Sequence, residues 1–370
     1  MDNSERMLAF GKNLRERRTA LAMTQAELAQ MLGYSAKAIS KWEKGKGLPS
    51  AVLLPVLASA LNTDIDSLMK VAFTPLYYLG IDGGGTKTEF VLTDATGNPV
   101  ATKRLDGSNP NDVGMSGCFG VLKEGITAVC QGIAYERVSV FAGIAGAGTG
   151  DNAQNITKFL STFGFAAADC GSDAKNAIAA SLGKRDGIMV IMGTGNVTFA
   201  QKDGQITKFG GYNYFFDEGG SGFTVGRDAI TYALKAEERG ETDTLFYQMI
   251  RQKCGTDSVL DRLRDFYIDG KRAVAQFAPV VFEAYDRGDA VAAAILEQNM
   301  AVVAEQISCA VQRLSYSCPE IFLVGGLTNK ADILVPMLKK HIVFDCNINA
   351  YTGSPVKGAL LLAGLEENYA

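Results

Sequence analysis

The feature that most constrains the fold is the stretch "LGIDGGGTKTEF", residues 79–90, in which three consecutive glycines separate two apolar segments. The flanking segments "YYLGID" and "TEFVLTD" are rich in aromatic and β-branched residues, a pattern typical of β-strands. Two strands joined by a glycine-rich turn predict a hairpin. The second strand excludes a dinucleotide-binding fingerprint, which needs a helix after its glycines. The Walker pattern is also excluded, because Thr86 stands between Gly85 and Lys87.

The residues of this turn have the chemistry needed to hold a phosphate. Glycine tolerates positive φ and leaves backbone N–H groups uncovered, so that an anion can approach the main chain itself. Thr86 adds a hydroxyl donor, and Lys87 adds positive charge. Asp82, at the end of the first strand, is placed to hold a magnesium ion through water.

Two later segments repeat the combination of a strand and a glycine turn. Residues 186–204, "DGIMVIMGTGNVTFAQKDG", predict a strand, a Gly-Thr-Gly turn and a second strand. Residues 320–338, "EIFLVGGLTNKADILVPML", predict a strand, a Gly-Gly turn and a helix. One glycine-rich hairpin is weak support for a nucleotide site, but three such segments in order favour one.

Composition and charge separate the first seventy residues from the rest. The chain has 370 residues, which predicts two or three domains. Residues 1–70 carry ten Lys/Arg and seven Asp/Glu, whereas residues 71–370 carry 26 and 33, so the front end is suited to a polyanion. The seven cysteines form no CxxC or Cys/His pair, and His341 is the sole histidine. We therefore expect a cytoplasmic protein with reduced, buried thiols, without a zinc site or a membrane span.

The first seventy residues have the pattern of short helices with tight joints. In "TQAELAQML", Thr24 and Glu27 form a predicted capping box, and Leu28, Met31 and Leu32 form a predicted apolar stripe. A turn containing glycine and a second short helix, "AKAISKWEK", follow. This is the geometry that lays one helix in the DNA major groove.

The pieces "MTQAELAQMLGYS" and "ISKWEKGKGLPS" resemble the phage-repressor (XRE, Cro-type) helix-turn-helix family over about residues 8–69. The resemblance implies a homodimer on a double-stranded DNA operator, with half-sites about 34 Å apart. It implies base-edge contacts from Ala36, Lys37, Ser40 and Lys41, and phosphate contacts from Gln25, Lys44 and Lys46. The alternative is a small helical bundle used for protein contacts.

In chain order, the three glycine segments resemble the phosphate-1, phosphate-2 and adenosine motifs of the actin-like ATPase superfamily. "SNPNDVG" (108–114), "GIAGAG" (143–148), "SDAKNAIAAS" (172–181), "FDEGGSGFTVGRDAI" (216–230) and "GSPVKGALLLAG" (353–364) resemble the BadF/BadG/BcrA/BcrD ATPase family, which includes N-acetylglucosamine and glucosamine kinases. The resemblance covers about residues 77–366. The expected fold is an all-α helix-turn-helix domain followed by a two-lobed α/β actin-like ATPase (ribonuclease H-like) fold.

These resemblances divide the chain into expected domains. Residues 1–70 form the DNA-binding domain and residues 71–77 a linker. Residues 78–183 form the first lobe, with the phosphate-1 hairpin and the sugar contacts. Residues 184–370 form the second lobe, with the phosphate-2 and adenosine motifs, and the final helix, 355–366, is expected to return to the first lobe.

The family resemblance also implies roles for single residues, with ATP and Mg²⁺ as cofactors. Besides Asp82 at the metal, the implied nucleotide contacts are Gly83, Gly84, Gly85, Thr86, Lys87, Gly193, Thr194, Gly195, Asn196, Gly325 and Gly326. The implied substrate contacts are Asn109, Asn111, Asp173, Asp217, Glu218 and Ser221. Structural alternatives stay open: a strand-to-helix joint at Gly325 and Gly326, a turn at Asn109, a solvated pair at Asp217 and Glu218, and a helix cap at Asp173.

The position of the catalytic base departs from the family pattern. A sugar kinase needs a carboxylate that accepts the hydroxyl proton, and many relatives place an aspartate just after the "GLAG"-like turn. Here "GIAGAGTGDNAQ" puts Gly148 at that position. Asp151 is the candidate base if the loop runs differently, and its alternative is a cap on the next helix. The loop "FDEGGSG" differs by one residue from the "GDEGSG" of the kinases.

Three functions follow from these features. The first is an ATP-dependent kinase of an amino sugar such as N-acetylglucosamine, coupled to transcription control through the DNA-binding head. The second is a catalytically silent, amino-sugar-responsive regulator, a plan with a precedent by analogy in the ROK family repressors. The third, the activator ATPase of acyl-CoA dehydratases or reductases, is disfavoured because an iron–sulfur cluster needs closely placed cysteines.

Overall fold

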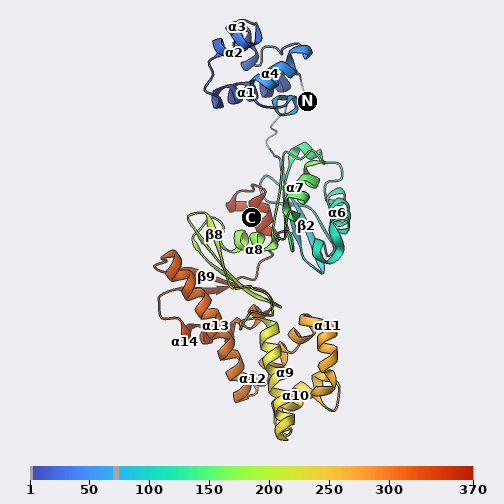
Figure 1. The fold of residues 1–370 in the computed structure, drawn as a ribbon, viewed down its shortest axis with the longest axis vertical. Coiled ribbons are helices and arrows are strands. Elements are labelled where there is room, and N and C mark those ends of the chain that lie inside the picture. The colour runs from blue at the N-terminus through green and yellow to red at the C-terminus, as the bar shows by residue number, and fades with distance from the viewer. Residues whose placement is uncertain (1–2, 70–74, 370) are drawn as a thin grey trace. The chain divides into compact units, whose positions relative to one another are not determined.

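The fold is described by a computed structural model of the chain, which covers residues 3–69 and 75–369. The chain divides into two compact units, one formed by residues up to 76 with 134–137 and the other by residues 77–133 and 138–370. Figure 1 shows the elements of both units. The linker expected at residues 71–77 lies largely outside the described residues, since the gap spans 70–74. Among the described residues, no helix combines the length and apolar character needed to span a bilayer.

The N-terminal unit consists of one 18-residue helix and several short helices around one apolar core. The capping box of Thr24 and Glu27 is confirmed at the start of its second helix, and Gly33 ends that helix with a φ of 69°. Ser35 caps the third helix by accepting a hydrogen bond from the N–H of Ala38. The helices are α1 (Asn3–Ala20), α2 (Gln25–Leu32), α3 (Ala36–Glu43), η1 (Ala51–Leu53), α4 (Leu54–Ala60) and α5 (Ile65–Met69).

The apolar stripe predicted on α2 is wrong at one position. Leu28 is fully buried, but Met31 is 57% exposed. The buried face of α2 includes Ala29 rather than Met31, which rotates Met31 toward solvent.

A buried ion pair joins α1 to α3 within this unit. The Nε atom of Arg18 donates a hydrogen bond of 2.6 Å to Oε1 of Glu43, and Arg18 also donates to the carbonyl of Met23. Gln25, predicted to contact a DNA phosphate, donates its side-chain amide to Oε2 of Glu43 at 2.6 Å. These contacts fix the start of α2 against the end of α3.

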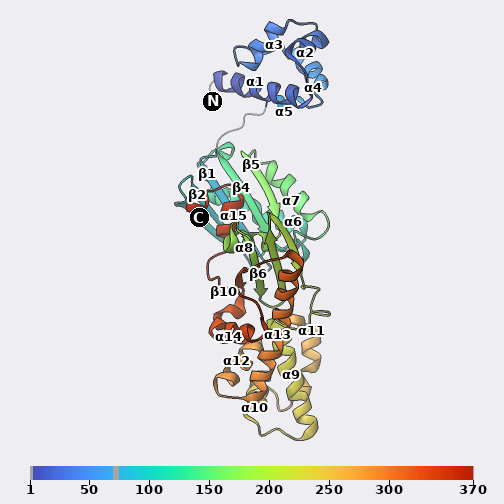
Figure 2. The ribbon, with the colours of Figure 1, turned by 90° about the vertical axis from the view of Figure 1, so that its left-hand side faces the viewer.

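The first lobe of the larger unit is a five-stranded mixed sheet with the strand order β3-β2-β1-β4-β5. The hairpin predicted around the glycines is confirmed, because β1 and β2 pair antiparallel with Asp82 opposite Glu89. Helices α6 and α7 pack on one face of this sheet and α15 on the other, as Figure 2 shows. The elements are β1 (Tyr77–Gly83), β2 (Lys87–Asp94), β3 (Pro99–Asp106), α6 (Pro110–Val129), η2 (Tyr135–Arg137, assigned to the smaller unit), β4 (Val138–Ile144), α7 (Asn152–Ser161), β5 (Ala167–Gly171), α8 (Asp173–Leu182) and α15 (Val356–Leu362).

The second lobe repeats this plan with the strand order β10-β9-β6-β7-β8. The strand-turn-strand at 186–204 and the strand-turn-helix at 320–338 are both confirmed, the latter with a short 3₁₀ segment before its helix. The elements are β6 (Gly187–Met192), β7 (Asn196–Lys202), β8 (Gln205–Phe209), α9 (Gly222–Arg239), α10 (Leu245–Cys254), η3 (Val259–Arg262), α11 (Leu263–Ala275), α12 (Ala278–Asp286), α13 (Ala290–Leu314), β9 (Glu320–Val324), η4 (Gly326–Lys330), α14 (Ala331–His341), β10 (Asn347–Ala350) and η5 (Glu367–Tyr369).

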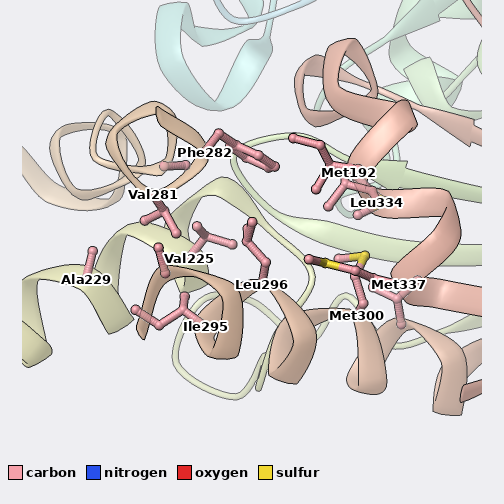
Figure 3. Packing of buried hydrophobic residues seen from close by; sticks show 14 of the residues in the cluster. Met192, Val225, Ala229, Val281, Phe282, Ile295, Leu296, Met300, Leu334 and Met337 are labelled. Atoms are coloured by element: carbon pink, nitrogen blue, oxygen red, sulfur yellow. The ribbon is translucent and has the colours of Figure 1, made fainter. Parts of the chain in front are cut away.

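The largest apolar core fills the space between this second sheet and the helices α9 to α14. Figure 3 shows Met192 of β6 packed toward Met300 of α13 and Met337 of α14, with Val225 of α9 nearby. This core anchors the strands that carry the second glycine turn, so that the turn is presented from a rigid base.

Helix α8 lies between the two sheets and packs against both. Its Ile178 and Leu182 join Met189 and Val324 of the second sheet in one apolar cluster. On its other side α8 crosses α15 so closely that a Cβ on Gly358 would overlap the backbone carbonyl of Asn176. The two helices therefore connect the lobes through tight backbone contact.

The cysteines only partly match the expectation of buried thiols. Cys118, Cys130, Cys170 and Cys254 are buried, whereas Cys309 and Cys318 are exposed and Cys346 is half-buried. Burial raises the pKa of Cys130 and of Cys170 to about 12, which keeps both as thiols.

Candidate functional site: a cleft between the two lobes

The hairpin turn of the first lobe is held rigidly by its neighbours. The N–H of Gly84 donates to the carbonyl of Lys87 at 2.8 Å, and the carbonyl of Gly84 accepts the N–H of Ser108 at 3.0 Å. A Cβ on Gly107 would overlap the carbonyl of Gly85, so that glycine is required there for the close approach. The turn is thereby fixed while the side chain of Thr86 stays exposed.

Asp82, the penultimate residue of β1, lies beside a buried asparagine that the sequence reasoning missed. The side-chain amide of Asn176 donates to Oδ1 of Asp82 at 2.8 Å and to the carbonyl of Ile81 at 3.1 Å. Burial raises the pKa of Asp82 to about 6, the hydrogen bond from Asn176 opposes this rise, and the nearby charge of Asp173 adds to it. A neighbouring cation such as Mg²⁺ would favour the ionised carboxylate.

A cleft of about 720 Å³ lies between the lobes and collects residues from both. The first lobe contributes the loop after β4, with Gly146, Gly148 and Thr149, and Asp173 at the start of α8. The second lobe contributes the turn of Gly193, Thr194, Gly195 and Asn196, together with Lys208, Tyr214, Asp217, Ser221 and Lys271. Solvent reaches Asp173 through the cleft, yet desolvation by the surrounding protein raises the pKa of Asp173.

The glycine turn of the second lobe is tied to the start of α9. The carbonyl of Gly193 accepts the N–H of Gly222 at 2.8 Å, and the carbonyl of Thr194 accepts the N–H of Phe223 at 3.2 Å. Asn196 donates its side-chain amide to the carbonyl of Gly219 and to Gln306 of α13, each at 3.1 Å. The N–H of Gly193 donates to the carbonyl of Gly195 at 3.0 Å, so the carbonyls of Gly193, Thr194 and Gly195 are all occupied, whereas the amides of Thr194 and Gly195 are not.

Four backbone amides at the two turns have no hydrogen-bond acceptor. Across residues 3–69 and 75–369, the N–H groups of Gly85, Thr86, Thr194 and Gly195 donate to no protein atom. Gly85 is half-buried, whereas Thr86, Thr194 and Gly195 are exposed, so these amides are open to solvent or a ligand. Successive free N–H groups in turns form anion-binding concavities. Thr194 and Gly195 line the cleft, whereas Gly85 and Thr86 are not among its lining residues. The free amides of each turn are suited to phosphate groups.

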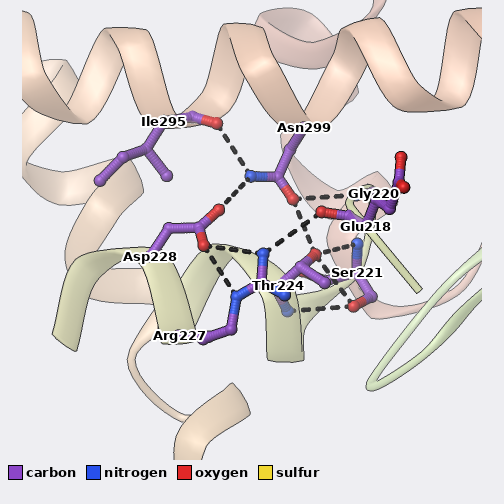
Figure 4. A network of polar contacts seen from close by, with 8 residues as sticks. All are labelled: Glu218, Gly220, Ser221, Thr224, Arg227, Asp228, Ile295 and Asn299. Carbon is purple, nitrogen blue, oxygen red and sulfur yellow. Dashed lines mark hydrogen bonds and ion pairs between the residues drawn. The ribbon is translucent and has the colours of Figure 1, made fainter. Parts of the chain in front are cut away.

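A buried polar network fixes the loop before α9, as Figure 4 shows. Oδ1 of Asn299, on α13, accepts the N–H of Gly220 at 2.9 Å and the hydroxyl of Thr224 at 2.7 Å. The Nδ2 atom of Asn299 donates to Asp228 at 3.1 Å. Ser221 is the N-cap of α9 and forms a capping box with Thr224. The same residue lines the cleft.

The two acidic residues predicted in this loop lie in different surroundings. Asp217 is half-buried, lines the cleft, and accepts the N–H of Tyr212 at 2.8 Å. Glu218 is exposed and lines a neighbouring pocket instead, while its backbone carbonyl accepts a hydrogen bond from Arg227. The structure therefore brings Asp217, but not Glu218, to the cleft.

Asn109 and Asn111 pack against the loop after β4. Asn109 is the N-cap of α6, where its side-chain oxygen accepts the N–H of Asn111 at 3.0 Å and its amide donates to Asp112 at 2.8 Å. Gly146, with a φ of 80°, lies so close that a Cβ there would overlap Oδ1 of Asn109. Asn111 reaches the hydroxyl of Thr149 at 3.3 Å. Both asparagines thus border the first-lobe side of the cleft.

The candidate base positions differ in their access to the cleft. Gly148 lines it, and a Cβ on Gly148 would meet no other atom within 4 Å. Asp151 is exposed, is not among the lining residues, and occupies the N-cap position of α7 without a capping hydrogen bond from its side chain. At the start of α8, the N-cap position is Ser172 and Asp173 follows it.

The third glycine segment packs on the second. Gly325 has a φ of 111°, and a Cβ there would lie 2.7 Å from the carbonyl of Met192 and 3.2 Å from the N–H nitrogen of Gly193. Gly326 begins η4, and a Cβ at this residue would meet open space. The adenosine and phosphate-2 segments are therefore adjacent, with an uncovered surface at Gly326.

The residues predicted to contact DNA lie on and after α3, except Gln25, which begins α2 and is half-buried. Ala36, Lys37, Lys41, Lys44 and Lys46 are exposed, and Ser40 is half-buried. The exposed lysines give this side of the N-terminal unit a positive charge suited to phosphates.

These observations define the class of the protein: a helix-turn-helix unit joined to a two-lobed ATPase of the actin-like fold, with the glycine turn of the second sheet at the cleft between the lobes. Residues 79–363 match the BadF/BadG/BcrA/BcrD ATPase family, and residues 14–68 match a helix-turn-helix family. The chain belongs to the BadF/BadG/BcrA/BcrD ATPase family and carries a helix-turn-helix domain before it in sequence.

Three known proteins are similar to the chain in sequence or in structure. The N-acetylmuramic acid/N-acetylglucosamine kinase of Clostridium acetobutylicum is 28% identical over 276 residues, covering 72% of this chain and 90% of that kinase. A putative N-acetylglucosamine kinase from Chromobacterium violaceum has a solved structure that superimposes on this chain with a TM-score of 0.63 and 25% sequence identity. The match covers 78% of this chain and 99% of the kinase. A ROK family transcriptional regulator, a homologue of the E. coli MLC protein, shares the fold at 13% identity with a TM-score of 0.53, over 100% of this chain and 97% of its own.

Proposed function

We propose that the protein binds Mg·ATP and an amino sugar between its lobes and uses this occupancy to control DNA binding by its N-terminal unit. The observation that carries the proposal is the set of four free amides on Gly85, Thr86, Thr194 and Gly195. Main-chain amides of this kind bind phosphate oxygens without the cost of reorganising side chains. The half-buried carboxylate of Asp82 would hold the magnesium ion through water, and the ion would neutralise phosphate charge.

The sugar would lie on the first-lobe side of the cleft. Asn109, Asn111 and Asp217 offer the neutral and acidic hydrogen-bonding groups that sugar hydroxyls need. The N-acetylmuramic acid/N-acetylglucosamine kinase named above makes an amino sugar the first substrate to test. A coupling free energy of about 1–3 kcal/mol between sugar and DNA would make a useful switch.

Sensing is favoured over catalysis by the absence of a side chain at Gly148. The cleft has open space at this residue, which the family pattern fills with a carboxylate. Without a base at this position, the sugar hydroxyl keeps its proton unless another carboxylate accepts it, and phosphoryl transfer loses a factor of about 10²–10⁴.

The test combines ligand binding with DNA binding. We expect Mg·ATP and N-acetylglucosamine each to raise the unfolding temperature of the larger unit, because a ligand that binds only the folded state stabilises it. We also expect the sugar to change the affinity for duplex DNA by about 5–150-fold. If neither ATP nor any sugar of a panel of amino sugars changes the unfolding temperature, the proposal is ruled out.

Phosphorylation of the sugar is the second candidate, and one observation favours it. Asp173 lines the cleft, and burial raises its pKa toward neutral pH, the range in which a general base works best. ATP-dependent formation of a sugar phosphate, abolished by Asp173→Asn and retained by Asp151→Asn, would support this role. If Asp151→Asn abolishes it instead, the base is Asp151.

A further inference from the structure

An arginine from the second lobe reaches the hairpin turn of the first. Helix α11 is interrupted at Gly270, which has a φ of 68° and a ψ of −159°, a conformation that glycine adopts readily. Lys271 and Arg272 follow this break. Lys271 lines the cleft, and the Nη2 atom of Arg272 lies 2.9 Å from the point that a Cβ on Gly85 would occupy.

The guanidinium of Arg272 is not engaged by the protein. Within the described parts of the chain this exposed side chain forms no ion pair and no hydrogen bond. The carboxylate of Asp112 lies near the same point of Gly85, with its Oδ2 atom 3.0 Å away, but this oxygen accepts the side-chain amide of Asn109. An unpaired arginine thus stands beside the free amides of Gly85 and Thr86.

We infer that Arg272 binds the terminal phosphoryl group of the ligand that the hairpin turn holds, and so distinguishes phosphorylated from unphosphorylated ligands. The inference rests on the proposed nucleotide and sugar site. Guanidinium binds phosphate through two parallel, charge-assisted hydrogen bonds, which a neutral hydroxyl cannot replace. The phosphoryl group has two possible sources, the γ-phosphate of ATP and the phosphate of a phosphorylated sugar, and the guanidinium chemistry is the same for both.

The experiment compares ligand pairs that differ by one phosphoryl group. Calorimetric titrations of the full chain would use Mg·ATP against Mg·ADP in one arm. The other arm would use N-acetylglucosamine 6-phosphate against N-acetylglucosamine. The variants are Arg272→Gln and a matched control, Arg264→Gln, which changes an exposed arginine on the same helix. Both side chains are exposed, so both variants should fold like the natural protein.

We expect Arg272→Gln to lower the affinity for the phosphorylated ligand of at least one pair by about 10- to 100-fold. The affinity for the unphosphorylated member of that pair, or for Mg·ADP, should change by less than about twofold. Arg264→Gln should leave the affinities for both members of each ligand pair unchanged. The arm that responds identifies the source of the phosphoryl group. If Arg272→Gln keeps the preference of the natural protein in both arms, the inference is wrong while the proposed site stands. If the natural protein binds none of the four ligands, the proposed function fails with it.

Discussion

The side-chain amide of Asn176 donates a hydrogen bond of 2.8 Å to the carboxylate of Asp82, across 94 positions of the sequence. Asn176 is fully buried on α8, the helix that packs between the two sheets. This bond orients the carboxylate at the end of β1 and makes α8 part of the candidate metal site.

Replacing Asp82 should separate stability from function. Burial raises the pKa of Asp82 to about 6 in the folded protein, above its ordinary value near 4. For an acid with a raised pKa, the folded state is favoured below the unfolded pKa and loses this advantage as pH rises toward 6. We therefore expect Asp82→Asn to be more stable than the natural protein at pH 7, by up to about 3 kcal/mol, and to show less pH dependence between about 4 and 6.

The same Asp82→Asn variant should lose the thermal stabilisation that Mg·ATP gives the natural protein. Denaturant unfolding at several pH values, with and without ligand, measures both effects. A variant that is less stable at pH 7 and still responds to Mg·ATP would contradict the assigned role of Asp82.

The buried ion pair of the N-terminal unit predicts a local defect. The side chain of Glu43 is 4% exposed and accepts hydrogen bonds from both Arg18 and Gln25. Glu43→Gln leaves Arg18 buried without its counter-charge, which should cost about 3–5 kcal/mol in that unit. We expect the variant to lose DNA binding and, in calorimetry, the unfolding transition of the N-terminal unit. Nucleotide binding by the larger unit should be retained. Loss of nucleotide binding as well would show that the units do not fold independently.

The lysines on α3 predict a salt-dependent DNA affinity. Lys37 and Lys41 are exposed and lie one helical turn apart. Their double replacement by alanine should weaken binding to duplex DNA and reduce the slope of log affinity against log salt by about 2. Lys12 of α1, which is paired with Glu16, provides the control substitution. An unchanged salt slope in fluorescence anisotropy titrations would argue against α3 as the DNA-binding element.

Gly148 predicts a gain of function. Because a Cβ at this residue meets open space, Gly148→Asp should fold normally and place a carboxylate in the cleft. We expect ATP-dependent phosphorylation of an amino sugar to rise by about 10²-fold or more over the natural protein. Gly120→Asp, at an exposed position of α6, is the control. A coupled assay that finds no increase would show that position 148 does not limit catalysis.

What the sequence predicted correctly was encoded locally. The hairpins at 79–90 and 186–204 follow from glycine turns between apolar strands, and the start of α2 follows from the capping box at Thr24. These signals extend over a few residues, so they do not depend on the tertiary fold.

What the sequence did not predict depends on distant contacts. Asn176 looked like one more polar residue in a helix until the fold placed it against Asp82. Asn299 and Gln306 lie on α13, more than seventy positions from the loop and strand they hold. The exposure of Met31 likewise depends on which neighbours cover α2. Packing across such distances decides these roles, and no local pattern records it.

The measurement that tests the account most directly is a calorimetric titration of Mg·ATP into the folded full-length chain. Free amides at Gly85 and Thr86 on one lobe, and at Thr194 and Gly195 on the other, predict a single site per chain. They also predict loss of measurable binding when Mg²⁺ is chelated or when Asp82 is replaced by asparagine. Absence of any heat of binding, from protein that unfolds cooperatively and is therefore folded, would contradict the assignment of these turns to phosphate.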